Sequence, residues 1–286
     1  MKPYRIKIYT RSANLELYEY AKGLFSIPNI PVVRLTDTTS DSYLYQILND
    51  KNCDIAINID EDAFIVDTKR MLNLVDYMLE NDYVNCGMPD GGALVIRGCN
   101  PIVTNPFFNI INLVAIRKQM KSIKDIKNFK YSDVKQQLIE QYPAELLKSI
   151  YDFDCSDFEP YYPFFFYTAY HFRTLYLPSK THTDGVSTIL CDPQGEAICY
   201  HSWWSRGFGK DPFHTKRILA LKDEAYAITQ KVQPTFGTSL RARMLVDKQV
   251  RFIVKWIIRI KKIIVGLLTF DEAYTSVLKK KIGLAK

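Results

Sequence analysis

The sequence predicts an α/β protein built on a mainly parallel sheet with helices packed on it. Short apolar strands alternate with stretches of helical spacing over roughly the first 200 residues. One of these strands, at 54–59, is apolar on both faces, as buried parallel strands are. Of the 286 residues, 47% are hydrophobic, which is enough to bury a large core.

The first part of the chain contains three strand–helix pairs. The helix of the second pair begins at Ser40 or Asp41, and Asp67 caps the helix of the third. A β-α-β-α-β-α order predicts a Rossmann-like sheet, because consecutive parallel strands need crossover helices. The predicted strands are 4–10, 30–36 and 54–59, and the predicted helices are 12–25, 39–50 and 67–82.

The second part of the chain is less regular. Asp211 and Pro212 mark the start of its last helix before the tail. Six cysteines without a C-x-x-C pair predict free thiols in a reducing cytosol. The predicted features are a turn and strand at 88–98, polar helices at 121–150, an aromatic stretch at 159–177, a strand ending at 201 and a helix at 211–232.

The positive charge of the chain is concentrated at one end. Residues 241–286 hold twelve Lys/Arg and three Asp/Glu, a balance of +9, and the other 240 residues hold 26 and 28, a balance of −2. Nucleic-acid-binding folds spread basic groups over their main body, so we expect no nucleic-acid partner. We expect a catalytic domain at 1–235 and a basic tail at 236–286.

Three carboxylates, Asp60, Glu61 and Asp62, follow the buried strand at 54–59. Ligands of open α/β sheets bind beyond the carboxyl ends of the strands. Asp60 and Asp62 are one residue apart, so both side chains can reach a shared point and hold Mg²⁺ or Mn²⁺. The alternative is that these acids only cap the next helix, a role that Asp67 already fills.

This D-x-D arrangement resembles the GT-A family of glycosyltransferases, over roughly residues 4–210. The resemblance implies a UDP- or GDP-sugar donor, whose diphosphate binds at Asp60 and Asp62 with the metal. It also implies a nucleotide-sugar half at 1–100 and an acceptor half at 101–235. By the same layout, Thr10, Arg11 and Asp37 face the nucleotide, although ordinary loop polarity explains them equally well.

The segment YHSWWSRGFG, residues 200–209, is similar to the late histidine element of GT-A enzymes. The resemblance makes His201 a further metal or diphosphate contact, and Arg206 a partner for phosphate oxygens. Trp203 and Trp204 then cover the donor or stack on a sugar. A core histidine beside core tryptophans is the alternative. The histidines at 171, 182 and 214 are expected to be structural.

An inverting glycosyltransferase needs a carboxylate as general base for the acceptor hydroxyl. Asp157 and Glu159 precede the aromatic stretch and are the candidates, although acids at a helix start also serve as caps. Asp184 is a weaker candidate. A retaining enzyme needs no such base, and Asn109 lies in a segment similar to a strand of some retaining families. We expect inversion.

Residues 248–268 predict a basic amphipathic helix. At about 100° per residue its basic stripe spans roughly 80°, and most of the remaining surface is apolar. This pattern is typical of a helix in a membrane interface, where anionic lipid attracts the basic side chains. Packing on the core or on a second subunit is the alternative. The stripe consists of Lys248, Arg251, Lys255, Arg259 and Lys262.

The resemblance implies a bacterial-type glycosyltransferase, and with the basic tail we expect it to act on a saccharide or lipid-linked saccharide in surface polysaccharide or lipopolysaccharide synthesis. No apolar signal core and no uninterrupted apolar run of about 18 residues is found, so we expect a cytoplasmic protein attached peripherally to the inner face of the membrane. A nucleotidyltransferase that makes sugar nucleotides is one alternative, but the segment after the first strand lacks its Gly-rich loop. A non-catalytic binding protein of the same fold is another.

Overall fold

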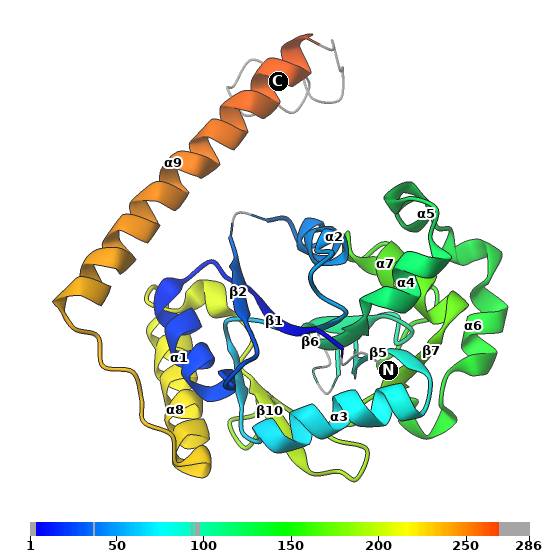
Figure 1. Ribbon diagram of the computed structural model, residues 1–286, viewed down its shortest axis with the longest axis horizontal. Helices are drawn as coiled ribbons and strands as arrows, with labels where there is room; N and C mark the ends of the chain where they lie inside the picture. Colours follow the sequence, from blue (N-terminus) through cyan, green and yellow to red (C-terminus); the bar gives the residue numbers. More distant parts are fainter. Residues whose placement is uncertain (1–3, 37, 93, 95–97, 269–286) are drawn as a thin grey trace. The chain divides into compact units, whose positions relative to one another are not determined.

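The structure is a computed structural model that describes residues 4–36, 38–92, 94 and 98–268. The chain divides into two compact units, Met1–Pro234 and Thr235–Lys286. The first unit contains two sheets and most of the helices, and the second contains one long helix (Figure 1).

The main sheet of the first unit has six strands in the order β2-β1-β3-β6-β5-β7. Neighbouring strands are parallel except at β6, which is antiparallel to β3 and β5. The prediction of a mostly parallel sheet is therefore confirmed. The carboxyl ends of the five parallel strands lie at one edge of the sheet. The strands are β1 (Ile6–Arg11), β2 (Val32–Leu35), β3 (Ile55–Ile59), β5 (Tyr83–Pro89), β6 (Thr104–Asn112) and β7 (Arg173–Tyr176).

The sequence prediction for residues 88–98 is only partly covered by the described residues. Residues 88–98 were expected to contain a turn and a strand, whereas β5 runs to Pro89 and the next described strand begins at Thr104. Most of the expected strand, residues 93 and 95–97, lies outside the described residues. β5 and β6 are neighbours in the main sheet and pair antiparallel.

A second, four-stranded sheet has the order β4-β10-β9-β8, with antiparallel pairing throughout. Strand β4 begins only a few residues after the end of β3, so the chain passes directly from one sheet to the other at Asp60, Glu61 and Asp62. The strands are β4 (Ala63–Ile65), β8 (Ser179–Thr181), β9 (Thr188–Cys191) and β10 (Ala197–His201).

Helices cover both faces of the main sheet (Figure 1). Alternate residues of each strand face opposite layers, so Ile8 and Ile57 pack in one core and Tyr9 and Ala56 in the other. The first core is shared with α1 (Leu15–Phe25), α3 (Thr68–Glu80), α8 (Pro212–Thr229) and the second sheet. The second core is shared with α2 (Ser42–Asn49), α4 (Leu113–Gln119), α5 (Ile123–Lys127), α6 (Lys135–Gln141) and α7 (Tyr162–His171).

Helix starts follow the local sequence. The side chains of Asn14, Asp67 and Asp211 each accept a hydrogen bond from a backbone N–H in the first turn of α1, α3 and α8. Asp41 occupies the cap position of α2 without a side-chain cap bond. Residues 121–150 form the expected short helices, including 3₁₀ turns at Tyr131–Asp133 and Ala144–Leu146.

One sequence expectation about cysteine is wrong. Cys99 and Cys155, expected to be free thiols, form a disulfide across 56 residues. The bond joins the loop before β6 to the segment that leads into α7. Cys53, Cys86, Cys191 and Cys199 are free and buried. Sequence spacing did not indicate this pair, because the two residues meet only through the tertiary fold.

The second unit contains α9, Thr238–Leu268. Several of its apolar side chains are exposed, among them Val250, Phe252 and Trp256. Within the described residues, the helices are all too short or too polar to cross a membrane.

Candidate functional site

The candidate site lies where the chain leaves β3 and enters β4. The backbone N–H of Asp60 donates to the carbonyl oxygen of Phe107 at 2.8 Å. Two residues later, the carbonyl of Asp62 accepts from the N–H of Ser202, and its carboxylate accepts from the Ser202 hydroxyl at 3.1 Å. The pairing of β4 with β10 thus brings residues about 140 positions apart into contact at the carboxyl edge of the main sheet.

Asp62 and His201 form a buried pair at this junction. Their closest atoms, Oδ1 and Nε2, are 3.6 Å apart, and both residues are less than 5% exposed. Burial acts to raise the pKa of Asp62. The electrostatic interaction with His201 and hydrogen bonds from His201 and Ser202 outweigh burial, so the pKa of Asp62 lies below its ordinary value.

Aromatic rings fix the orientation of His201. Its imidazole stacks on the ring of Phe107, with centroids 4.1 Å apart and planes 5° apart, and contacts Trp203 at 4.2 Å. Nδ1 of His201 is buried and has no hydrogen-bond partner among the described residues. The ring is therefore held by stacking, with its Nε2 edge directed towards Asp62.

Asp60 has a different environment. Its Oδ1 atom is shielded from solvent and has no hydrogen-bond partner in the described part of the chain. Burial raises the pKa of Asp60 to about 8, against the opposing charge of Arg11 and with a smaller contribution from Asp62 and Glu61. A buried carboxyl oxygen without a donor is an unsatisfied acceptor, so a bound cation or donor group would stabilise it.

Glu61, between the two aspartates, points into the protein and organises the loop after β1. Its Oε2 atom accepts from the Ser12 hydroxyl at 2.8 Å and from the N–H groups of Ala13 and Asn14 at 2.8 and 2.6 Å. Burial raises its pKa to about 7, despite these bonds. The carboxylate thus holds the turn that leads into α1.

The predicted metal ligands are only partly gathered. Among the residues that the structure describes, no group of three or more His, Cys, Asp or Glu side chains stands ready to hold a metal ion. The pair Asp62–His201 offers one oxygen and one nitrogen ligand, and Asp60 offers an unsatisfied oxygen nearby in sequence. This set fits a cation that takes its remaining ligands from phosphate oxygens and water, as Mg²⁺ does.

The predicted nucleotide contacts lie around Arg11, at the carboxyl end of β1. Its guanidinium lies over the ring of Tyr43, 5.6 Å from the centroid. Burial acts to lower the pKa of Arg11, but nearby negative charges, Asp60 first among them and Glu159 included, outweigh burial and raise it. Thr10 is fully buried, and its hydroxyl has no partner in the described residues. Asp37 lies outside the described residues.

Of the two candidate bases, Glu159 interacts electrostatically with Arg11 at the carboxyl end of β1. The charge of Asp60 acts on Arg11 as well. Glu159 is partly buried just before α7, and its carbonyl accepts from the N–H of Tyr162 at 3.0 Å. Asp157 is exposed.

Asp90 anchors the start of α7, which follows Glu159 in the chain. It is fully buried and accepts from the hydroxyls of Tyr161 and Tyr162 at 3.1 and 3.0 Å. It also accepts from the Asn105 side chain and the Gly91 N–H. The MPDGG turn therefore supports the segment that carries Glu159.

The other acceptor-side candidates have structural contacts. Asp184 accepts from the N–H groups of Val186 and Ser187 and from the Ser187 hydroxyl, which makes it the organiser of a turn. Asn109 is buried in β6 and donates to Thr104 Oγ1 at 3.0 Å. Gly87 lies opposite it in β5, and a Cβ there would come within 2.4 Å of the Asn109 side chain.

The tryptophan segment after His201 has a strained backbone. Trp203 and Trp204 both have positive φ, 58° and 53°, in a backbone region that residues other than glycine rarely adopt. Arg217 of α8 donates to the Trp203 carbonyl at 3.1 Å. Trp203 is buried, whereas Trp204 is 40% exposed and Arg206 is exposed.

Sequence reasoning missed several residues that shape the site. Phe107, which stacks on His201, carries no local signal, because it is one apolar residue in an apolar strand. Ser202 directly follows His201, a predicted metal ligand, and this position in the sequence was the one signal that could have identified it. The inward role of Glu61 was not predicted, since three successive acids look alike in sequence. Arg217 looks like an ordinary basic residue of a helix.

Comparisons with known proteins do not assign the chain to a family. No protein-family model and no curated protein matches it. Among solved structures, A197 from STIV is 14% identical with a TM-score of 0.33, over 68% of this chain and 93% of that chain. S. aureus TarS 1-349 is 10% identical with a TM-score of 0.32, over 86% of this chain and 71% of that chain. Similarities at this level assign no function, so the function has to be inferred from the site itself.

Proposed function

We propose that this protein is a metal-dependent GT-A glycosyltransferase. It transfers a sugar from a UDP- or GDP-sugar to a saccharide acceptor in surface polysaccharide or lipopolysaccharide synthesis. The observation that carries the proposal is the buried Asp62–His201 pair at the carboxyl edge of the sheet, two residues after Asp60, whose Oδ1 atom is buried and unsatisfied.

These residues, with Arg11, Arg206 and Thr10, would bind the nucleotide-sugar donor. Asp62 and His201 hold Mn²⁺ or Mg²⁺, and Asp60 completes the protein's contribution. When bound, the cation neutralises the diphosphate and makes it a better leaving group. Arg11, fixed over Tyr43, and the exposed Arg206 supply positive charge for phosphate oxygens. Thr10 contributes a buried hydroxyl at the end of β1.

The acceptor side centres on Glu159. It takes the proton from the acceptor hydroxyl as that oxygen attacks the anomeric carbon, and the bond to the diphosphate breaks, with inversion. The support is electrostatic, because the charges of Asp60 and, more weakly, Glu159 both act on Arg11. Asp90 and the two tyrosines it binds hold this carboxylate's segment in place.

The tail suits an acceptor attached to a lipid. Apolar side chains of α9 such as Phe252 and Trp256 are exposed, and Lys248 is exposed beside them. Each basic residue close to an anionic lipid surface contributes about 1 kcal/mol to the free energy of membrane binding. We therefore place the protein at the inner face of the cell membrane, bound peripherally through residues 248–268.

The test is nucleotide binding with and without metal. Calorimetry with UDP and GDP, in Mn²⁺ and in EDTA, should show binding that requires Mn²⁺. Asp62→Asn should weaken that binding at least tenfold, whereas Asp76→Asn, an exposed carboxylate of α3, should leave it unchanged. Equal binding of the nucleotides in Mn²⁺ and EDTA would overturn the metal assignment.

A second measurement separates the alternatives. Slow Mn²⁺-dependent hydrolysis of a UDP- or GDP-sugar, releasing the nucleoside diphosphate, is expected of a glycosyltransferase. A nucleotidyltransferase would instead release pyrophosphate from a nucleoside triphosphate and a sugar phosphate. A non-catalytic protein would release neither product.

A further inference from the structure

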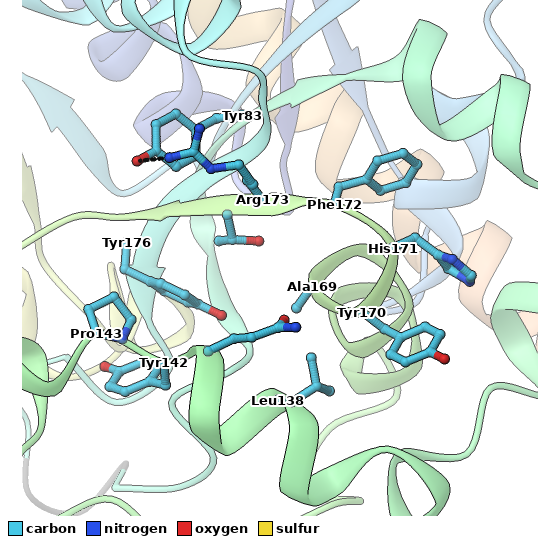
Figure 2. A pocket seen from close by; sticks show the side chains of 12 residues that line it. Tyr83, Leu138, Tyr142, Pro143, Ala169, Tyr170, His171, Phe172, Arg173 and Tyr176 are labelled. Atoms are coloured by element: carbon cyan, nitrogen blue, oxygen red, sulfur yellow. Dashed lines mark hydrogen bonds between the residues drawn. The ribbon is translucent and has the colours of Figure 1, made fainter.

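A cavity lies at the far edge of the main sheet, on the side of strand β7. Its volume is about 500 Å³, within the range of roughly 300–1,000 Å³ that is common for small-molecule sites. It is bounded by the edge strand β7, the end of α6, the end of α7 and the first residue of β5 (Figure 2). None of these lining residues belongs to the site described above.

The cavity lies at the far side of the sheet from the transfer site. Tyr83 and Arg173, which line the cavity, are the first residues of β5 and β7, whereas Asp60 follows the last residue of β3. These three strands run in the same direction, so the cavity extends along β7 from the opposite end of the sheet to Tyr176 at the carboxyl end. Three strand spacings of about 4.8 Å also separate β7 from β3, or about 14 Å across the sheet.

The lining combines aromatic rings with fixed polar groups. Tyr170, Phe172 and Tyr176 are partly exposed rings around the cavity (Figure 2). The guanidinium of Arg173 lies 4.3 Å from the centre of the Tyr83 ring and donates to the Tyr83 hydroxyl and to the carbonyl of Asn81. The lining contains no carboxylate side chain. The walls are therefore rigid, aromatic and either neutral or positive.

We propose that this cavity binds the saccharide acceptor at sugar units remote from the reacting hydroxyl. A sugar ring has an apolar C–H face and a rim of hydroxyls, and tyrosine has an apolar ring with a polar tip, so the two match. Binding there would retain a long acceptor between transfers. The inference rests on the proposed function in one respect, that the acceptor is a saccharide.

An added peptide strand is a poorer occupant. β7 is an edge strand, but it has only four residues, so it offers few backbone partners. It also begins with the charged and exposed Arg173, a feature that blocks strand addition. A saccharide uses the side chains of the lining and does not need a long free edge.

The experiment measures oligosaccharide binding by saturation-transfer difference NMR and calorimetry. The probes are cellohexaose, maltohexaose, chitohexaose and a hyaluronan hexasaccharide. We expect at least one to bind, and we expect Tyr170→Ala to raise its Kd at least tenfold, whereas Tyr170→Phe stays within threefold of the wild type. Phe213→Ala, which removes an exposed ring of α8, should have no effect.

Because Tyr170 packs near Phe129, a second variant keeps the test valid if Tyr170→Ala unfolds. Gln141 lines the cavity at the exposed end of α6, and Gln141→Ala should raise the Kd at least threefold. No binding of any hexasaccharide, or unchanged binding by both variants, overturns the inference. Metal-dependent nucleotide binding is measured on the same proteins. Saccharide binding without nucleotide binding would refute only the proposed function, and the reverse would refute only this inference.

Discussion

Replacing Glu61 with glutamine tests how the carboxylates at the end of β3 are arranged. The three donors around Glu61 all bond to Oε2, so an amide oxygen placed there keeps all three bonds. Glu61→Gln should therefore fold normally. Glu61→Ala removes the acceptor from Ser12, Ala13 and Asn14. Water reaches Ala13, so two donors, those of Ser12 and Asn14, are left without the Glu61 oxygen, and at about 1–3 kcal/mol per unsatisfied buried donor the change should cost about 2–6 kcal/mol.

The size of the stability change in Glu61→Gln depends on pH. The folded-state pKa of Glu61 is raised by burial from 4.5 to about 7, so protonation stabilises the folded state. That stability is fully present below pH 4.5 and is lost as the pH rises through about 7. The shift corresponds to about 3 kcal/mol, of which about 2.5 kcal/mol falls between pH 5 and pH 8. Glutamine does not titrate. The unfolding free energy of Glu61→Gln relative to the wild type should therefore rise by about 2.5 kcal/mol as the pH increases from 5 to 8.

The assay is urea unfolding of the full chain in EDTA at pH 5 and pH 8, with Glu61→Ala as the comparison. A difference in unfolding free energy between wild type and Glu61→Gln that stays constant with pH would refute the reasoning. So would a glutamine variant as unstable as the alanine variant at both pH values, since it would show that Oε2 is not the shared acceptor.

Two further predictions concern catalysis and the tail. Glu159→Gln should lower the rate of sugar transfer by a factor of about 10²–10⁴ while leaving nucleotide affinity unchanged. Asp157→Asn, at an exposed position, should transfer nearly normally. Near-normal transfer by both variants would favour a retaining mechanism or Asp184 as the base. Truncation after Pro234, the boundary between the two units, should leave the melting temperature of the catalytic unit unchanged and abolish co-sedimentation with anionic liposomes. Binding of the full chain should fall with added salt but persist in part, because apolar burial is not screened. A full-length protein that ignores anionic liposomes would contradict the membrane assignment.

Much of the fold was predictable from local sequence. Period-two and helical spacing located β1, α1 and α3, and a short run that is apolar on both faces located β3. Asp67 and Asp211 marked helix starts, because capping is a contact within one turn. The position of Asp60 and Asp62 at the carboxyl end of a buried strand also followed, since an apolar run that ends in charges must end at the edge of the sheet. The long helix of the tail was visible in its repeating pattern.

Contacts between distant segments were decided only by the tertiary structure. The pairing of β4 with β10 puts His201 beside Asp62, and no local pattern encodes which strands of a second sheet will pair. The same holds for the antiparallel β6, for the Cys99–Cys155 disulfide and for the stacking of Phe107 on His201. Asp60, Glu61 and Asp62 look equivalent in sequence, but each experiences a different field. Burial and the main partner of each carboxylate, Arg11 for Asp60, Asn14 for Glu61 and His201 for Asp62, set its pKa, and the packing of the whole domain brings those partners there.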